Sequence, residues 1–325
     1  MGLWIRACGG SRRMATSQAL PLAAGATTHS VPARRPTAGI WSNALAKLRH
    51  DKVTLIAAAI LLLLIALAAA ADALANNVFH YGFTKQDLLN GYQKPTPTDP
   101  AFWFGGDDIG RSQIVRLLYG ARVSLAVGIG AAIINLTIGL TLGLAAGFLR
   151  GWFDDLVQFV ISTLNSVPLV PLLLIVSILF QPSAVSLVVI LGLVLWPNAT
   201  LFVRGQTLAL REREFVAAGR VSGAGNARIM FRHIMPNVLP LVFVLTAIDV
   251  GTLILLESAL SFLGLGISPP TPSWGNMLTN AAQDLSRGPW LVYAPGAAIF
   301  LTVLCLYLVG DGLRDALDPR LNRTE

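Results

Sequence analysis

The chain has 325 residues, of which 54% are apolar and only 13% are charged. Soluble domains carry about 25% charged residues, so this composition excludes an ordinary soluble globular protein and indicates one that places its apolar surface in lipid. The formal net charge of +7 could attract nucleic acid. However, no aromatic-interleaved or helix-turn-helix pattern accompanies the basic residues, so a nucleic-acid-binding module is excluded.

The first 45 residues are rich in Ser, Thr, Pro, Gly and Arg and contain no compact apolar stretch of the kind found in a secretory signal. This composition predicts a disordered cytoplasmic tail. Residues 46–75 then contain the first apolar run, Val53 to Ala71, which Lys52 and Asp72 bound. A run of about 20 apolar residues is long enough to cross the hydrocarbon core as a helix.

Five further apolar runs are each long enough to cross a bilayer: Ala121 to Phe148, Leu156 to Phe180, Ser183 to Val203, Val238 to Leu263, and Trp290 to Gly310. We therefore predict an all-α integral membrane protein with six transmembrane helices, five of them in a core spanning residues 121–310. A soluble helical bundle is the alternative, and the uninterrupted length of the runs disfavours it.

The distribution of basic residues predicts the orientation. With the N-terminus inside, 18 of the 24 Lys and Arg residues are cytoplasmic, as the positive-inside rule requires. Residues 76–120 and 264–289 are then extracytoplasmic, while residues 204–237 and the C-terminal segment 311–325 are cytoplasmic. The short links at Arg150 to Asp155 and at Gln181 to Pro182 predict antiparallel neighbouring helices.

Several predicted spans contain glycines or prolines at positions that affect helix packing or helix geometry. The second run has a repeated GxxxG spacing formed by Gly139, Gly143 and Gly147. Such a stripe lets another helix approach closely. Packing within the bundle is a better explanation for it than a subunit interface. The third and fourth runs contain kinking prolines, which suit a translocation path but also occur in membrane proteins that transport nothing: Pro168, Pro171 and Pro197.

The cytoplasmic segment predicts two helices joined by a corner. Leu208 to Arg220 should continue the fourth span as a helix, and Gly223 and Gly225 should end it. Asn226 can then cap a second short helix that Pro236 ends. We expect this elbow to have nothing of its own to bury against, and therefore to need a partner.

This segment resembles the EAA loop of binding-protein-dependent ABC importers, whose peptide branch reads close to REFVEAAR, a glycine and RHILPN. Positions that match the pattern are Arg213, Glu214, Phe215, Val216, Arg220, Gly223, Arg232, His233, Ile234, Pro236 and Asn237. Ala217, Ala218 and Gly219 stand in place of the name-giving triplet, and Met235 replaces a leucine. The resemblance implies that this loop docks on an ATPase subunit through Glu214, Phe215, Ala217, Ala218, Gly219, Arg220, Gly223, Arg232, His233 and Pro236.

The resemblance extends from the first span to near the C-terminus. Phe104 to Leu125 is similar to the segment that begins the peptide-permease domain, apart from Gly106 and Ser112. Glu257 to Leu278 and Gly310 to Leu321 are similar to the end of the branch's second-type permease. The implied fold is that of ABC importer permeases (MetI-like), in a bacterial inner or plasma membrane. The implied partners are a second permease subunit, two ATPase subunits, an extracytoplasmic substrate-binding protein and membrane lipid.

Acidic residues in or near the spans are the remaining candidates. An ionised carboxylate is costly in hydrocarbon, so Glu257 and Asp249 are candidates to line the pathway or gate. The alternative for both is an interhelical hydrogen bond. Asp107 and Asp108 are a weak cation signal, because a metal needs further ligands. A loop pair or helix cap, with Arg111 as ion-pair partner, explains them better.

No catalytic constellation is visible, and neither a disulfide nor a metal site is indicated by Cys8 and Cys305. The chain has no GxxxxGK[ST] phosphate loop, no HExxH and no GxSxG. We therefore expect a transport subunit rather than an enzyme, without a cofactor of its own, whose partner ATPases hold ATP and Mg²⁺. The resemblance implies di- or oligopeptides as substrates, with nickel chelates or glutathione as alternatives. An ATP-independent secondary transporter that uses Asp249 and Glu257 as a proton relay is the runner-up.

Overall fold

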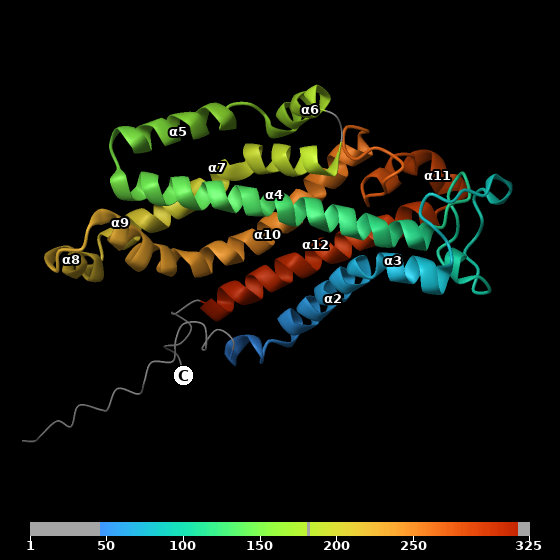
Figure 1. Ribbon diagram of the computed structural model, residues 1–325, viewed down its shortest axis with the longest axis horizontal. Helices are drawn as coiled ribbons and strands as arrows, with labels where there is room; N and C mark the ends of the chain where they lie inside the picture. Colours follow the sequence, from blue (N-terminus) through green and yellow to red (C-terminus); the bar gives the residue numbers. More distant parts are fainter. Residues whose placement is uncertain (1–45, 181–182, 318–325) are drawn as a thin grey trace, which may run out of the picture. The chain divides into compact units, whose positions relative to one another are not determined.

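The computed structural model describes residues 46–180 and 183–317 (Figure 1). Within these ranges the regular secondary structure is helical, and the only β-type pairing is an isolated bridge between Gly106 and Ser112. The predicted tail 1–45, the link at Gln181 to Pro182 and the last residues of the predicted C-terminal segment, 318–325, lie outside the described residues.

Five helices of the described chain are long and apolar enough to cross a membrane. They are α2 (Lys52–Ala69), α4 (Gln113–Leu149), α7 (Ala184–Arg211), α10 (Met235–Phe262) and α12 (Trp290–Leu317). A sixth span exists when α5 (Trp152–Asn165) and α6 (Leu169–Leu179) are counted as one, although they are bent by 87°. The third predicted run is therefore a broken span, because Pro168 removes a donor and disfavours helical backbone at Val167.

Helices α4 and α7 form the tightest pair and run side by side along the bundle (Figure 1). The three glycines of the repeated GxxxG face α7 directly, so that a Cβ at Gly139 would meet Ala199. A Cβ at Gly143 would lie 2.7 Å from the Val203 Cβ, and one at Gly147 would lie 2.8 Å from the Arg204 carbonyl oxygen. The glycine stripe thus serves packing within the chain, as the sequence predicted.

The remaining spans complete the bundle around this pair. Helix α10 packs against α12 and α4, and α12 packs against α2. Asp51 caps α2 by accepting a hydrogen bond from the Val53 amide at 3.0 Å. At the other end, Asp72 in α3 (Ala71–Leu74) accepts hydrogen bonds from Tyr119 at 2.5 Å and Arg122 at 2.9 Å. These bonds tie the end of the first span to α4.

The two predicted extracytoplasmic segments meet at one end of the bundle. The first contains the π-helix η1 (Ala75–Phe79) and the 3₁₀ turns η2 (Leu88–Asn90) and η3 (Pro100–Phe102), and the second contains η5 (Asn276–Leu278) and α11 (Ala281–Arg287). Two long-range hydrogen bonds join this end. Tyr92 donates to Asp284 at 3.0 Å, and Trp290 Nε1 donates to the Gly106 carbonyl at 3.1 Å.

The acidic pair in the first of these segments has the predicted ion-pair partner. Arg111 Nε lies 2.6 Å from a carboxylate oxygen of Asp107, and Arg111 Nη2 lies 3.9 Å from Asp108. Asp107 also accepts hydrogen bonds from the Ile109 and Arg111 amides at 3.2 and 2.8 Å. The Asp107 carboxylate is therefore bonded by groups of its own loop, as expected for a loop pair.

Candidate functional site

The first break in the predicted coupling elbow comes earlier in the chain than expected. Helix α7 ends at Arg211, and α8 (Glu214–Val221) starts only after Arg213, whose backbone is extended at φ −79° and ψ 150°. The prediction of one continuous helix through Arg220 is therefore wrong. Charged residues with good helix propensity cannot prevent a break when the next helix must turn away from the span to pack.

The corner after α8 is built around Gly223, as the sequence predicted. Gly223 has a φ of +78°, and its amide donates to the Arg220 carbonyl at 2.9 Å. The Ala224 amide reaches back to the Gly219 carbonyl at 3.0 Å. This pair of bonds is the Schellman arrangement, in which a left-handed residue ends a helix and satisfies its last carbonyls. The backbone conformation therefore requires glycine here.

The second elbow helix differs from the prediction at both ends. Helix α9 (Asn226–Ile229) is preceded by Gly225, which has the extended N-cap conformation in place of Asn226. Pro236 does not end a helix, because the chain continues through the π-helical turn η4 (Met230–Ile234) into α10. A proline in the first turn of a helix has no amide to lose. The elbow is thus continuous with α10, which corresponds to the fifth predicted span.

The elbow is anchored to the bundle, contrary to the expectation that it has nothing to bury against. Val216 of α8 and Ile229 of α9 are 1% and 0% exposed. They belong to an apolar cluster with Leu144 and Phe148 of α4 and Val203 of α7. The reason is that the break at Arg213 turns α8 back over the ends of these helices. The elbow is therefore packed against the ends of α4 and α7.

Polar bonds hold the base of the elbow to the turn between α4 and α5. Arg204 forms a two-pronged ion pair with Asp154, with N to O distances of 2.5 and 2.7 Å. Arg211 donates to the Phe148 carbonyl at 2.7 Å. Sequence reasoning missed the pairing of Arg204 with Asp154, since the two residues are distant in the chain and share only their predicted side of the membrane. A bidentate pair fixes geometry as well as contributing energy.

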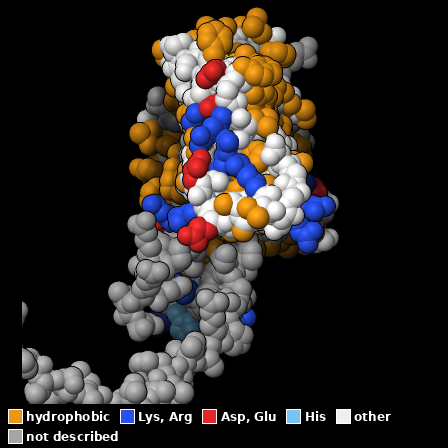
Figure 2. All heavy atoms as spheres, turned by 90° about the vertical axis from the view of Figure 1, so that its left-hand side faces the viewer, with side chains coloured by type: hydrophobic (Ala, Val, Ile, Leu, Met, Phe, Trp, Pro, Cys, Tyr) orange, Lys and Arg blue, Asp and Glu red, His pale blue; other side chains and the backbone are white. Residues whose placement is uncertain are grey.

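The outer face of the elbow combines apolar and basic side chains. Phe215, Val221 and Phe231 are 40%, 89% and 53% exposed. Figure 2 looks onto this end of the bundle and shows Lys and Arg side chains running through the middle of the face. The elbow has four exposed arginines, which are Arg213, Arg220, Arg228 and Arg232. None of them has an ion-pair partner among the described residues. An unpaired apolar and basic surface of this kind is typical of a protein interface.

Known proteins are similar in sequence over this site. Residues 139–323, which include the whole elbow, match the family described as binding-protein-dependent transport system inner membrane component. The chain belongs to this family. The oligopeptide transport system permease protein OppC of Bacillus subtilis is 33% identical over 284 residues, which are 87% of this chain and 91% of that protein.

Two other relatives agree in length and identity. OppC of Escherichia coli is 36% identical over 281 residues, covering 86% of this chain and 91% of the relative. The dipeptide transport system permease protein DppC of Alkalihalophilus pseudofirmus is 36% identical over 309 residues, covering 95% and 99%. The likeness to these inner membrane components therefore runs through nearly all the described residues.

The predicted docking residues of this inner membrane component mostly face outward. Gly219 and His233 are half-buried, while the others are exposed: Glu214, Phe215, Ala217, Ala218, Arg220, Gly223, Arg232 and Pro236. A Cβ at Gly219 would lie 4.0 Å from Ile229, which is ordinary contact, and a Cβ at Gly223 would meet nothing within 4 Å. Their assignment to ATPase docking stays a prediction, and their exposure leaves them free to make contacts.

The two candidate pathway residues lie in the interior. Glu257 is fully buried and accepts hydrogen bonds from Ser124 of α4 at 2.9 Å and from Ser261 of α10 at 2.8 Å. Asp249 is half-buried and has a longer contact with Asn135 Nδ2, at 3.4 Å. In this conformation both carboxylates make the interhelical bonds that the sequence left as the alternative. A pathway role for either residue stays a prediction.

The hydroxyls that hold Glu257 also hold the second predicted extracytoplasmic segment. Ser124 Oγ accepts a hydrogen bond from the Trp274 amide at 3.2 Å, and Ser261 Oγ accepts one from the Ile267 amide at 3.1 Å. Glu257 therefore orients two serines that fasten this segment onto α4 and α10. Such second-layer bonding is invisible in the sequence, because each serine alone is an ordinary residue of an apolar helix.

Proposed function

We propose that this inner membrane component is a permease subunit of an ATP-driven importer that moves peptides across the bacterial inner membrane. Membership of the transport family and the peptide names of relatives at 33–36% identity support the proposal. Those relatives are named for oligopeptides or dipeptides. Nickel chelates and glutathione are the alternative cargoes, and direct uptake measurements separate them.

The single observation that carries the coupling part of this proposal is the anchored elbow. The exposed Phe215 and Val221 lie on the same short helix as Val216, which is buried among side chains of α4 and α7. A partner that pushes on the exposed face therefore pushes on these two spans directly. The elbow is also continuous with α10. Closure of paired ATPase subunits against it would move the ends of three spans together.

The proposed topology puts the elbow in the cytoplasm and the opposite end of the bundle outside. The unpaired arginines of the elbow support this, because cytoplasmic loops carry an excess of Lys and Arg. The opposite end, formed by residues 76–112 and 263–289, would receive a substrate-loaded binding protein. A second permease subunit would complete the path, since this chain supplies one set of spans.

The test is to express the chain with its ATPase subunits, its second permease and its binding protein. We expect Phe215→Asp with Val221→Asp to weaken attachment of the ATPase subunits by at least about 30-fold, since interface anchors contribute about 1 kcal/mol or more each. Leu89→Asp is the matched control, because Leu89 is 96% exposed but lies at the opposite end of the bundle. Equal attachment in the elbow variant and the control would contradict the coupling role.

Uptake by the complete complex in proteoliposomes tests the transport assignment. We expect ATP-dependent accumulation of a radiolabelled peptide, dependent on the binding protein, and no ATP hydrolysis by this chain alone. Accumulation of a nickel chelate or glutathione without any peptide would move the assignment to the alternative cargoes. Substrate accumulation driven by a proton gradient in the absence of ATPase subunits would instead favour the secondary transporter.

A further inference from the structure

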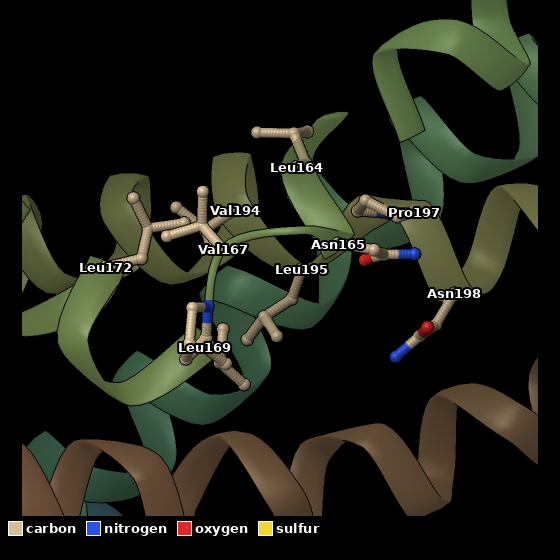
Figure 3. A pocket seen from close by; sticks show the side chains of 10 residues that line it. Leu164, Asn165, Val167, Leu169, Leu172, Val194, Leu195, Pro197 and Asn198 are labelled. Atoms are coloured by element: carbon tan, nitrogen blue, oxygen red, sulfur yellow. The ribbon is translucent and has the colours of Figure 1, made fainter. Parts of the chain in front are cut away.

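The break between α5 and α6 opens a cavity against α7. The cavity has a volume of about 290 Å³, and its wall includes Asn165, Pro168, Pro197 and Asn198. Figure 3 shows the two asparagine side chains near Pro197 on one side of the cavity, with most of the labelled leucines and valines on the other side. The bend of 87° between α5 and α6 creates this space, because the chain leaves the surface of α7 where a straight helix would cover it.

Both asparagines are polar side chains without partners. Each is exposed, and neither side-chain amide has a hydrogen-bond partner among the described residues. By contrast, the hydroxyl of Thr163 on the same helix bonds to the Phe159 carbonyl of its own backbone at 2.8 Å. A carboxamide exposed in an apolar span without a bond costs free energy unless it faces water or a polar ligand.

The position of the pair along the helices places it within the predicted membrane span. Asn198 lies six residues before Arg204, where the predicted cytoplasmic segment begins, which is about 9 Å at 1.5 Å per residue. Asn165 ends α5 about 20 Å from its start at Trp152. Because the hydrocarbon core is about 30 Å thick, both positions fall inside it, and a short asparagine side chain does not reach the interface from there. The polar group that they face must therefore be inside the membrane.

Pro197 adds to the polarity of this site. It has no amide proton, so the carbonyl four residues earlier, that of Leu193, lacks its α-helical donor. Irregular backbone at membrane depth is tolerated where it lines a polar or water-filled cavity. The broken α5–α6 pair and the proline in α7 thus converge on one place in the bundle, together with the two free amides.

We infer that Asn165 and Asn198 line the translocation path and hydrogen-bond the backbone amides of a peptide in transit, an inference that rests on the proposed peptide function. A carboxamide carries both donors and an acceptor, which match the N–H and C=O of any peptide unit irrespective of its side chains. An uncharged pair binds weakly enough to release what it has received, as conduction through a pathway requires. The site therefore suits a carrier of many peptide sequences.

The test compares Asn165→Leu and Asn198→Leu in the complete reconstituted complex. Leucine has the same number and branching of side-chain heavy atoms as asparagine, although it is bulkier, and it has neither donor nor acceptor. The probes are radiolabelled trialanine and trilysine, which share a backbone and differ in side chains. We expect each variant to lower uptake of both peptides by a similar factor, about 3- to 10-fold, which is the loss of one hydrogen bond worth roughly 1 kcal/mol.

Two controls make the comparison specific. Thr141→Val removes a hydroxyl on α4 that bonds only to its own helix, at 2.8 Å from the Thr137 carbonyl oxygen. Thr141 lies on the side of α4 opposite the glycine stripe that faces α7, so this variant should transport like the wild type. Asn198→Gln keeps the carboxamide and should retain more uptake than Asn198→Leu.

Each outcome decides the matter. Unchanged uptake by both leucine variants, with normal uptake by the wild type, overturns the inference and leaves the proposed function intact. Loss of the second permease subunit from the purified complex would assign the amides to a subunit contact and would also overturn it, as would reduced uptake of only one of the two peptides. A wild-type complex that takes up neither peptide contradicts the proposed function itself. Equal loss for both peptides in an intact complex supports the inference.

Discussion

Replacing Gly223 with valine tests whether the corner of the elbow transmits force. Its φ of +78° is a left-handed conformation, which costs an L-residue about 1–2 kcal/mol. A Cβ at this position would meet no atom within 4 Å, so the substitution adds backbone strain without a steric clash inside the chain. The strain corresponds to a change of about 5- to 30-fold in the population of the native corner.

The strain should be released locally, because the corner lies outside the spans. Leaving the left-handed conformation breaks the bonds from Gly223 to Arg220 and from Ala224 to Gly219. Helix α8 would then lose its orientation over α9, while the buried spans stay packed. We expect normal abundance of the Gly223→Val protein in membranes and a loss of attached ATPase subunits and of uptake by about 5- to 30-fold.

Three measurements in one strain check this expectation: abundance in membranes, co-purifying ATPase subunits and peptide uptake. Gly223→Asn is the matched control, since asparagine tolerates the left-handed conformation better than valine, and it should retain most of the attachment. Gly219→Ala should be neutral or stabilising, because alanine is favoured in helices by about 1 kcal/mol and its Cβ fits 4.0 Å from Ile229. Full attachment and full uptake with valine at Gly223 would refute the reasoning.

Two further predictions concern topology and the buried carboxylate. An impermeant thiol reagent on whole cells should label Leu89→Cys but not Val221→Cys, both being highly exposed positions in the isolated chain; the reverse pattern would invert the orientation. Glu257→Gln keeps an oxygen that can accept from Ser124 and Ser261, whereas Glu257→Leu leaves the protons of both hydroxyls without this acceptor and should cost about 1–3 kcal/mol for each. Lost uptake by a normally abundant Gln variant would show that the carboxylate itself serves transport.

The spans were predictable because lipid imposes one simple requirement on them. A run such as Val53 to Ala71 must be helical in hydrocarbon, and the structure places α2 at Lys52–Ala69. The Gly143 stripe was equally readable, since close approach of helices needs small residues at a fixed spacing. Boundaries were less certain: α4 starts at Gln113, well before the apolar run at Ala121, because a capped polar turn can extend a helix beyond the membrane.

Only part of the elbow could be predicted from its own sequence. The left-handed Gly223 was predictable, because a chain reversal between two short helices favours glycine. The break at Arg213 was not, since it follows from where Val216 finds apolar partners on α4 and α7. The passage through Pro236 depends on the π-helical turn before it, and hydropathy carries no signal for that geometry.

The interior contacts depend on pairs of residues that only the folded chain brings together. Ser124 and Glu257 are far apart in sequence, as are Asp154 and Arg204. For Asn198, a visible signal existed: an amide directly after a proline in an apolar run. It has no meaning without the break at Pro168 that uncovers it.

The glycine stripe of α4 also limits how this bundle can change shape. Because the backbones of α4 and α7 touch at Gly143 and Gly147, no layer of flexible side chains separates them. If α7 slid along α4 by a fraction of a helical turn, Val203 would collide with the backbone of α4. The two helices are therefore expected to move together as one rigid unit. The Arg204 to Asp154 ion pair ties the start of α5 to the same unit. Bending is then left to the joint between α5 and α6, which lies beside the cavity that Asn165 and Asn198 line.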